Sequence, residues 1–177
     1  ARPGDGFFIP PGVVHYAGAG LVVIEIREGN DPELVVSRWG EQRSETTAQE
    51  EALAAVQFEN RRSWRIASEA GRSSYTRRIP LVRHCPVFVV DEFRLKDYFF
   101  DRTTGESCHL LSAIRGACDI RAADTTVTLQ QGTVCCIPAD TGDYHVSAHG
   151  EAPADFLQIT LRQQESAGTK RRVPYTL

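Results

Sequence analysis

Short apolar runs separated by turn-forming residues dominate the hydrophobic and polar pattern near the start of the chain. Residues 6–9 and 21–26 are β-branched and aromatic runs bounded by glycine and proline. Such runs predict two strands of a hairpin-like unit. A third run over 33–39 predicts another short strand. The first part of the chain therefore favours β structure.

The period of the pattern changes after residue 46. Thr47 and Glu50 have the spacing of a capping box, in which two side chains satisfy backbone N–H groups at a helix start. Leu53 and Val56 follow at the spacing of one helix face, which predicts a helix over about 48–57. Residues 59–78 are rich in arginine, serine and glycine and predict a linker.

The pattern is typical of β structure from Leu81 onward. Turn residues interrupt the apolar runs at short intervals, which favours a sandwich or barrel of antiparallel strands. The tail has no clear period. The predicted strands are 86–95, 97–101, 107–115, 117–122, 125–129, 133–138, 144–147 and 154–161.

Composition excludes several classes of function. The chain has 177 residues, of which 41% are hydrophobic and 24% charged, and its net charge is -3 at pH 7. These values are typical of a globular protein and give no basis for a general nucleic-acid or membrane surface. No apolar run approaches the length of a membrane span. We therefore expect no nucleic acid and no membrane among the partners.

Cysteine usage bears on the compartment. The five cysteines are an odd number without a CxxC pair, which favours a reducing, cytoplasmic location. Each cysteine is interpreted as a small buried hydrophobe. The chain contains no methionine and opens on "ARPGDG", a turn into a strand, so we expect that residue 1 is not the natural start.

Two stretches of the chain repeat one frame. "GDGFFIPPGVVH" and "GTVCCIPADTGD" share a glycine, an apolar strand and a proline at the same spacing. His15 follows the turn in the first copy, whereas Asp143 falls at that position in the second and Asp140 replaces the turn glycine. The frame predicts a strand that crosses a barrel wall and a turn that aims the next residue inward.

The first copy, G(X)5PXG(X)2H, resembles the second conserved motif of the cupin superfamily. In cupins the histidine is a metal ligand, and neutral imidazole suits zinc, iron or manganese. The other cupin motif has HxH and a following glutamate. Before the second copy, "TTGESCHLLSAIRG" keeps the closing glycine Gly116 but has His109 at the glutamate position. The resemblance implies that His15 binds a metal and that the second barrel holds none.

The order of the parts is more specific than either motif. A Pro-x-Gly-x-x-His turn precedes "EIREGND", a Trp-Gly pair, a helix ending in "ALAAVQFEN" and the strand "RHCPVFVVDEFRL". This order resembles the C-terminal half of class I mannose-6-phosphate isomerases over nearly the whole chain. The resemblance implies a mostly β fold, a cupin-type antiparallel β-barrel (jelly roll) with a partial second cupin and one short helix. The expected parts are the last strands of an incomplete metal-type cupin (1–45), a helix and linker (46–80), a metal-free C-terminal cupin barrel (81–165) and a tail (166–177).

The function that this resemblance implies is a zinc-dependent aldose–ketose isomerisation. Enzymes of the family interconvert mannose 6-phosphate and fructose 6-phosphate, so the expected ligand is a sugar phosphate and the expected cofactor is zinc. We expect the chain alone to be inactive, because zinc needs three or four protein ligands. The alternative is a non-catalytic cupin module that binds a sugar or sugar phosphate or serves assembly. Exposed N-terminal strands would then favour self-association.

Four residues receive roles from the resemblance. His15 matches the family's last zinc ligand in chain order. Glu25 and Arg38 are candidate catalytic residues, and Arg27 is a candidate substrate-binding residue that would grip the phosphate. The family's arginine position is Val35 here, and valine neither carries a charge nor donates a hydrogen bond. The alternatives remain a turn histidine, a solvent-facing glutamate and solvated surface arginines.

Overall fold

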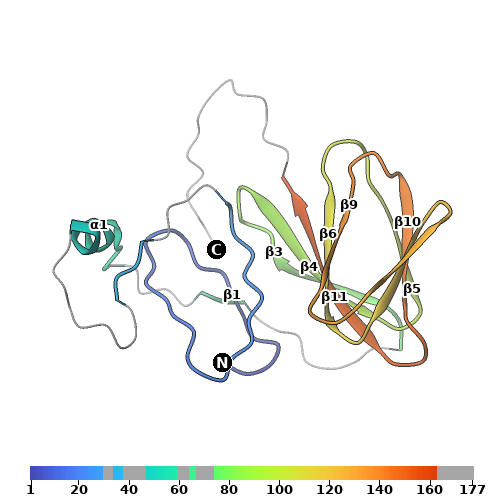
Figure 1. Ribbon diagram of the computed structural model, residues 1–177, viewed down its shortest axis with the longest axis horizontal. Coiled ribbons are helices and arrows are strands. Elements are labelled where there is room, and N and C mark those ends of the chain that lie inside the picture. Colours follow the sequence, from blue (N-terminus) through green and yellow to red (C-terminus); the bar gives the residue numbers. More distant parts are fainter. Residues whose placement is uncertain (30–33, 38–46, 60–63, 67–73, 163–177) are drawn as a thin grey trace. The chain divides into compact units, whose positions relative to one another are not determined.

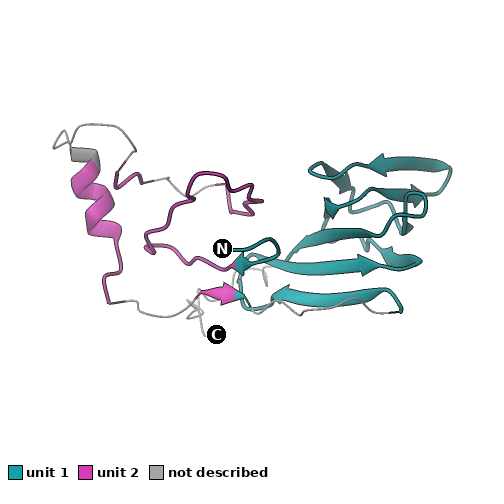
Figure 2. Cartoon of the chain, turned by 90° about the horizontal axis from the view of Figure 1, so that it is seen from below, with its two compact units in different colours: residues 1–6, 66–177 teal, residues 7–65 magenta. Residues whose placement is uncertain are grey.

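The computed structural model describes residues 1–29, 34–37, 47–59, 64–66 and 74–162. The chain divides into two compact units, one formed by residues 1–6 and 66–177 and the other by residues 7–65 (Figure 2). Nearly all of the regular structure belongs to the first unit (Figure 1). The described residues contain no helix that is long and apolar enough to cross a bilayer.

The N-terminal part contains less β structure than its sequence predicts. Strand β1 (Gly6–Phe7) pairs with β2 (Arg65–Ile66) in a two-stranded sheet. The described residues 8–29 and 34–37 form neither helix nor strand, so the strand predicted over 21–26 is wrong. The strand predicted over 33–39 is wrong at 34–37, and its remaining residues lie outside the described ones. A strand needs a paired backbone, and an apolar run by itself does not provide one.

The predicted helix is confirmed. Helix α1 (Thr47–Ala55) begins one residue before the predicted range and ends two residues before its end. The buried position is Ala52, which is 2% exposed, whereas Leu53 is 48% exposed. The predicted helix face is therefore wrong. Val56 lies beyond the helix end, so it cannot share a helical face with Leu53.

Nine strands form two antiparallel sheets, and we call this assembly the barrel. One sheet has the order β5-β10-β7-β8 and the other β3-β4-β11-β6-β9. The strands are β3 (Arg77–Val82), β4 (Phe88–Leu95), β5 (Tyr98–Arg102), β6 (His109–Arg115), β7 (Cys118–Ala122), β8 (Thr125–Leu129), β9 (Val134–Ile137), β10 (Asp143–Ala148) and β11 (Ala154–Leu161). All eight strands predicted from residue 86 onward are confirmed, so the chain is mostly β with antiparallel sheets.

Strands β2 and β3 are the elements that the sequence did not predict, and the linker predicted over 59–78 is wrong at Arg65–Ile66 and at the start of β3. The longer of the two is β3. It lies partly within the range predicted as a linker, and both its arginines and Pro80 argue against a strand. Its position at the edge of the five-stranded sheet explains the proline, because an edge strand leaves one side of its backbone unpaired. Its register with β4 shifts between Pro80 and Val82.

The hydrophobic core lies between the two sheets. The rings of Phe93 and Phe156 stack with centroids 4.9 Å apart, and the Phe99 ring centroid lies 4.0 Å from that of Phe93. Leu111 and Val146 are fully buried beside them. Burial of a side chain of this size contributes about 1.5–3 kcal/mol. The inner faces of the two sheets are therefore joined by side chains that alternate with outward positions along each strand.

Candidate functional site

Five strands of the barrel each carry a polar residue at an inward position. These residues are Asp91, Asp101, His109, Tyr144 and Gln158, and we call them the polar layer. Each lies two positions from a core residue of its own strand. Because side chains alternate along a strand, both residues face the interior. The register then sets Asp101 opposite Tyr144 and Asp91 opposite Gln158. The polar layer therefore occupies one end of the barrel, beyond the aromatic core.

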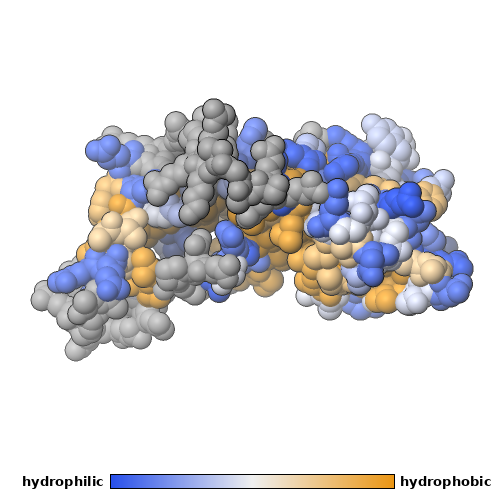
Figure 3. Space-filling model, turned by 90° about the horizontal axis from the view of Figure 1, so that it is seen from above, coloured by the Kyte–Doolittle hydropathy of each residue, from blue (hydrophilic) through white to orange (hydrophobic). Residues whose placement is uncertain are grey.

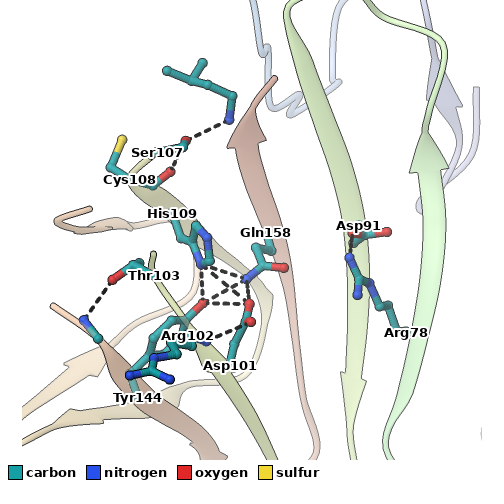
Figure 4. Close-up of polar contacts among 12 residues, drawn as sticks. Arg78, Asp91, Asp101, Arg102, Thr103, Ser107, Cys108, His109, Tyr144 and Gln158 are labelled. Atoms are coloured by element: carbon teal, nitrogen blue, oxygen red, sulfur yellow. Dashed lines mark hydrogen bonds and ion pairs between the residues drawn. The ribbon is translucent and has the colours of Figure 1, made fainter. Parts of the chain in front are cut away.

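The Tyr144 hydroxyl is the centre of a hydrogen-bond network that joins both sheets (Figure 4). It donates to Asp101 Oδ2 at 3.2 Å and accepts from Gln158 Nε2 at 2.8 Å. His109 Nδ1 lies 2.8 Å from the same oxygen. Gln158 Nε2 also donates to Asp101 Oδ2 at 2.5 Å. Such a network holds each side chain in one orientation, because a buried polar group needs a hydrogen-bond partner.

Burial sets the protonation of this network. The pKa of His109 is lowered by burial, and the nearby Asp101 carboxylate opposes that shift. The pKa of Tyr144 is raised well above its ordinary value, mainly by burial and next by the charge of Asp101. Both effects favour the uncharged side chains. The neutral imidazole and phenol thus surround a single carboxylate.

A second charged group adjoins the network. The Asp91 side chain is 3% exposed and accepts a hydrogen bond from Arg78 Nη2 at 2.6 Å, while Arg83 binds its other oxygen. The hydrogen bond from Arg78 to Asp91 raises the pKa of that guanidinium. Arg78 also lies over the Phe93 ring, 5.7 Å from its centroid. Two cations thus compensate the buried carboxylate of Asp91.

The polar layer and the two arginines beside it present hydrogen-bonding groups. Both arginines pair with Asp91, and the charge of Asp101 also acts on Arg78. Among the residues that the structure describes, no group of three or more histidine, cysteine or acidic side chains could hold a metal ion. The Arg78 side chain is 57% exposed, so the layer is open to solvent at this point. A polyhydroxylated ligand or a phosphate is the type of molecule that could exchange with these contacts.

The repeat predicted Asp143 as the residue after the turn that faces inward, and this is wrong. Its side chain is 81% exposed and pairs with Arg102 at 3.3 Å. Tyr144 takes the inward position instead. Gly142, with a φ of 79°, ends the turn just before β10, and alternation along that strand then directs Asp143 outward and Tyr144 inward.

The residues predicted from the family resemblance lie elsewhere in the chain. His15 is exposed, and its Nδ1 lies 2.9 Å from the Val13 carbonyl oxygen. Glu25 and Arg27 are both exposed, on a segment without helix or strand. Arg38 lies outside the described residues. The roles predicted for these four residues therefore stay predictions.

Sequence reasoning missed most of the polar layer. His109 was singled out by its spacing from Gly116, but its partners were not. The available signal was alternation, since Asp91 and Phe93 share one face of β4 while Tyr144 and Val146 share one face of β10. Alternation does not show which strand ends meet, and the register decides that.

Comparisons with known proteins connect the barrel with a family. Residues 80–153 match the family described as mannose-6-phosphate isomerase, cupin domain. No curated protein sequence matches the chain. One similar solved structure is the protein TT1209 from Thermus thermophilus, with 18% identity and a TM-score of 0.44, covering 51% of this chain and 86% of that one. Another is a cupin superfamily protein from Desulfitobacterium hafniense, with 17% identity and a TM-score of 0.44, covering 54% and 84% respectively. The cupin domain of Cnp3 from Schizosaccharomyces pombe has 10% identity and a TM-score of 0.44, covering 52% and 67%.

Proposed function

We propose that this chain, whose residues 80–153 match the cupin-domain family of mannose-6-phosphate isomerase, is part of a sugar-phosphate isomerase in which the barrel is the non-catalytic part. The proposed reaction of the intact protein is the aldose–ketose isomerisation of mannose 6-phosphate to fructose 6-phosphate, in the cytoplasm. The observation that supports a non-catalytic barrel is the polar layer. Its inward positions carry a tyrosine, a glutamine, a histidine and two aspartates. The first three bond to one another, and Tyr144 and Gln158 also bond to Asp101.

Zinc is the cofactor proposed for the intact protein, with His15 as one ligand. A hydrogen bond from Nδ1 to the Val13 carbonyl would leave Nε2 with the free lone pair that a metal requires. The described residues by themselves do not fit a zinc site, because they supply no group of three ligands. The remaining ligands would have to come from outside the described part of the chain. We therefore derive no catalytic step through zinc.

The proposed roles of the other residues follow from their chemistry. Isomerisation moves a proton between neighbouring carbons, and the exposed Glu25 carboxylate is the proposed base. Arg27 is the proposed phosphate ligand, because a guanidinium binds phosphate through paired N–H groups. Arg38 is proposed to stabilise negative charge that develops during the transfer. Val35 cannot perform this role.

The test is an isomerase assay with mannose 6-phosphate and fructose 6-phosphate, on the intact gene product and on the 177-residue chain, together with zinc analysis of both. We expect zinc-dependent turnover by the intact protein and none by the chain alone. The variant His15→Ala should abolish turnover and lower the zinc content. His84→Ala, at an exposed histidine before β4, is the matched control and should change neither. Full turnover by the chain alone, or by the His15→Ala variant, would contradict the proposal.

A second candidate function is a non-catalytic module that binds a sugar phosphate at the polar layer. The exposed Arg78, which pairs with Asp91 at the edge of the polar layer, favours it. Calorimetry with mannose 6-phosphate distinguishes the two, since this candidate requires binding by the chain alone without turnover. Arg78→Gln should then weaken binding about tenfold, and Arg102→Gln on the outer face should not.

Self-association through the N-terminal segment belongs to the same proposal. Large apolar side chains of this segment are exposed, among them Val14, Tyr16, Val22 and Val23. Hydrophobic residues also reach the surface in Figure 3. Contiguous exposed apolar side chains are typical of interaction surfaces. Contact between two copies through residues 7–26 would shield them.

A further inference from the structure

Two cysteines meet on the outer surface of the five-stranded sheet. Cys136 lies in edge strand β9, directly opposite Leu110 of β6. Cys108 lies two residues before Leu110, so it shares the face of Cys136 and is its diagonal neighbour. The pKa of the Cys136 thiol is raised first by burial and next by the neighbouring Cys108 thiol. The two cysteines are therefore neighbours on one face of the sheet while both thiols are reduced.

The surroundings of the pair distinguish it from the other cysteines. Cys136 is exposed and Cys108 is partly exposed, so a small oxidant can reach them. Cys135, next in the chain, points to the opposite face and packs against the core. Cys85 and Cys118 are buried. Among the five cysteines, all of which the structure describes, Cys108 and Cys136 share the outer face, whereas the partly exposed Cys135 side chain is directed to the core side.

We propose that Cys108 and Cys136 form a reversible disulfide that joins edge strand β9 to the start of β6, with a low-molecular-weight disulfide such as oxidised glutathione as the oxidant. One cysteine thiolate attacks a sulfur of the oxidant and displaces a first glutathione thiolate. The second cysteine thiolate attacks the resulting mixed disulfide and displaces the other glutathione. The two protons lost by the cysteines are taken up by the two released thiolates.

The position of the bond gives it a consequence for the barrel. The Ser107 hydroxyl donates a hydrogen bond to the Cys108 carbonyl at 2.8 Å. The same hydroxyl oxygen accepts one from the Leu161 backbone N–H at 3.1 Å. Cys108 is thus held to β11 and precedes His109 of the polar layer. A bond from Cys108 to Cys136 would fix the otherwise free edge strand. In a reducing compartment, such bonds are typically transient and respond to oxidation.

The test is oxidation of the purified chain in buffers with graded ratios of oxidised to reduced glutathione. Trypsin separates the two cysteines, because residues 103–115 contain only Cys108, whereas residues 122–162 contain Cys135 and Cys136. We expect a cross-linked pair of these peptides that disappears on reduction, and a melting temperature about 5 °C or more higher in the oxidised chain.

Serine variants identify the partner. Cys136→Ser and Cys108→Ser should each abolish the cross-link, whereas Cys135→Ser, the matched control, should retain it. Far-UV circular dichroism of each variant checks that the barrel is intact. The proposal is overturned if the folded wild-type chain yields only glutathione adducts, or if the cross-link persists in Cys136→Ser.

Discussion

Asp101 is the residue at which the polar layer meets the edge of the four-stranded sheet. Its Oδ2 accepts the hydrogen bonds from Tyr144 and Gln158. Its Oδ1 accepts the backbone N–H of Arg102 at 2.8 Å. That N–H belongs to edge strand β5, where another strand could otherwise bind it. The Asp101 side chain therefore accepts hydrogen bonds both from the polar layer and from the backbone of the sheet edge.

His109 makes the stability of the protein depend on pH. Its folded-state pKa is lowered by burial, so the unfolded chain binds the proton more tightly. Stability should therefore fall as the pH decreases through the ordinary histidine pKa of about 6.5 toward the lower folded value. Urea unfolding between pH 8 and pH 5 measures this loss. The variant His109→Gln should lose less stability over the same range.

His84→Gln is the control for this experiment, because its histidine is exposed. Its pH profile should follow that of the wild-type chain. Equal slopes in the wild-type chain and the His109→Gln variant would show that His109 does not carry the effect.

At the scale of elements, the sequence predicts strands better than it predicts pairing. Strands β4 to β11 follow from alternation and turn residues alone, because each has a face that the core needs. Strand β3 was missed because Pro80 and its arginines contradict local preference, and only its edge position makes them tolerable. The run 21–26 failed for the opposite reason, since strong β preference does not form a strand without a paired partner.

The turn between β6 and β7 depends on Gly116. Its φ of 64° lies in the left-handed region, and an added Cβ would stand 2.6 Å from the backbone oxygen of Pro153. We expect Gly116→Ala to destabilise the protein by about 2 kcal/mol or more, through strain and through this clash. Thermal and urea unfolding measure the change.

The variant Gly105→Ala separates the backbone strain from the clash with Pro153. Gly105 has a φ of 86° with open space around it, so its variant should show only the backbone strain of about 1 kcal/mol. Equal costs at the two positions would contradict the role assigned to the contact with Pro153.

At the scale of the whole molecule, the barrel is complete within residues 77–161. Both of its sheets and every residue of the core cluster lie in this range. We therefore expect a fragment of residues 74–162 to fold alone, because a domain with its own core does not need its neighbours. Circular dichroism and calorimetry should show β structure and one cooperative thermal transition. A fragment without such a transition would show that the barrel depends on other residues.

The sequence by itself determined the mostly β architecture, the helix near residue 50 and the positions of eight strands, whose ends lie within two residues of the predicted ones. It also identified the resemblance to mannose-6-phosphate isomerases, and residues 80–153 match the cupin-domain model of that family. These properties depend on local periodicity and on motif spacing, which are written along the chain. The tertiary structure decided that Tyr144 rather than Asp143 faces inward, that five distant polar residues form one layer, and that Cys108 meets Cys136. These properties depend on register and on which strand ends coincide, and a shift of one residue would reverse each of them.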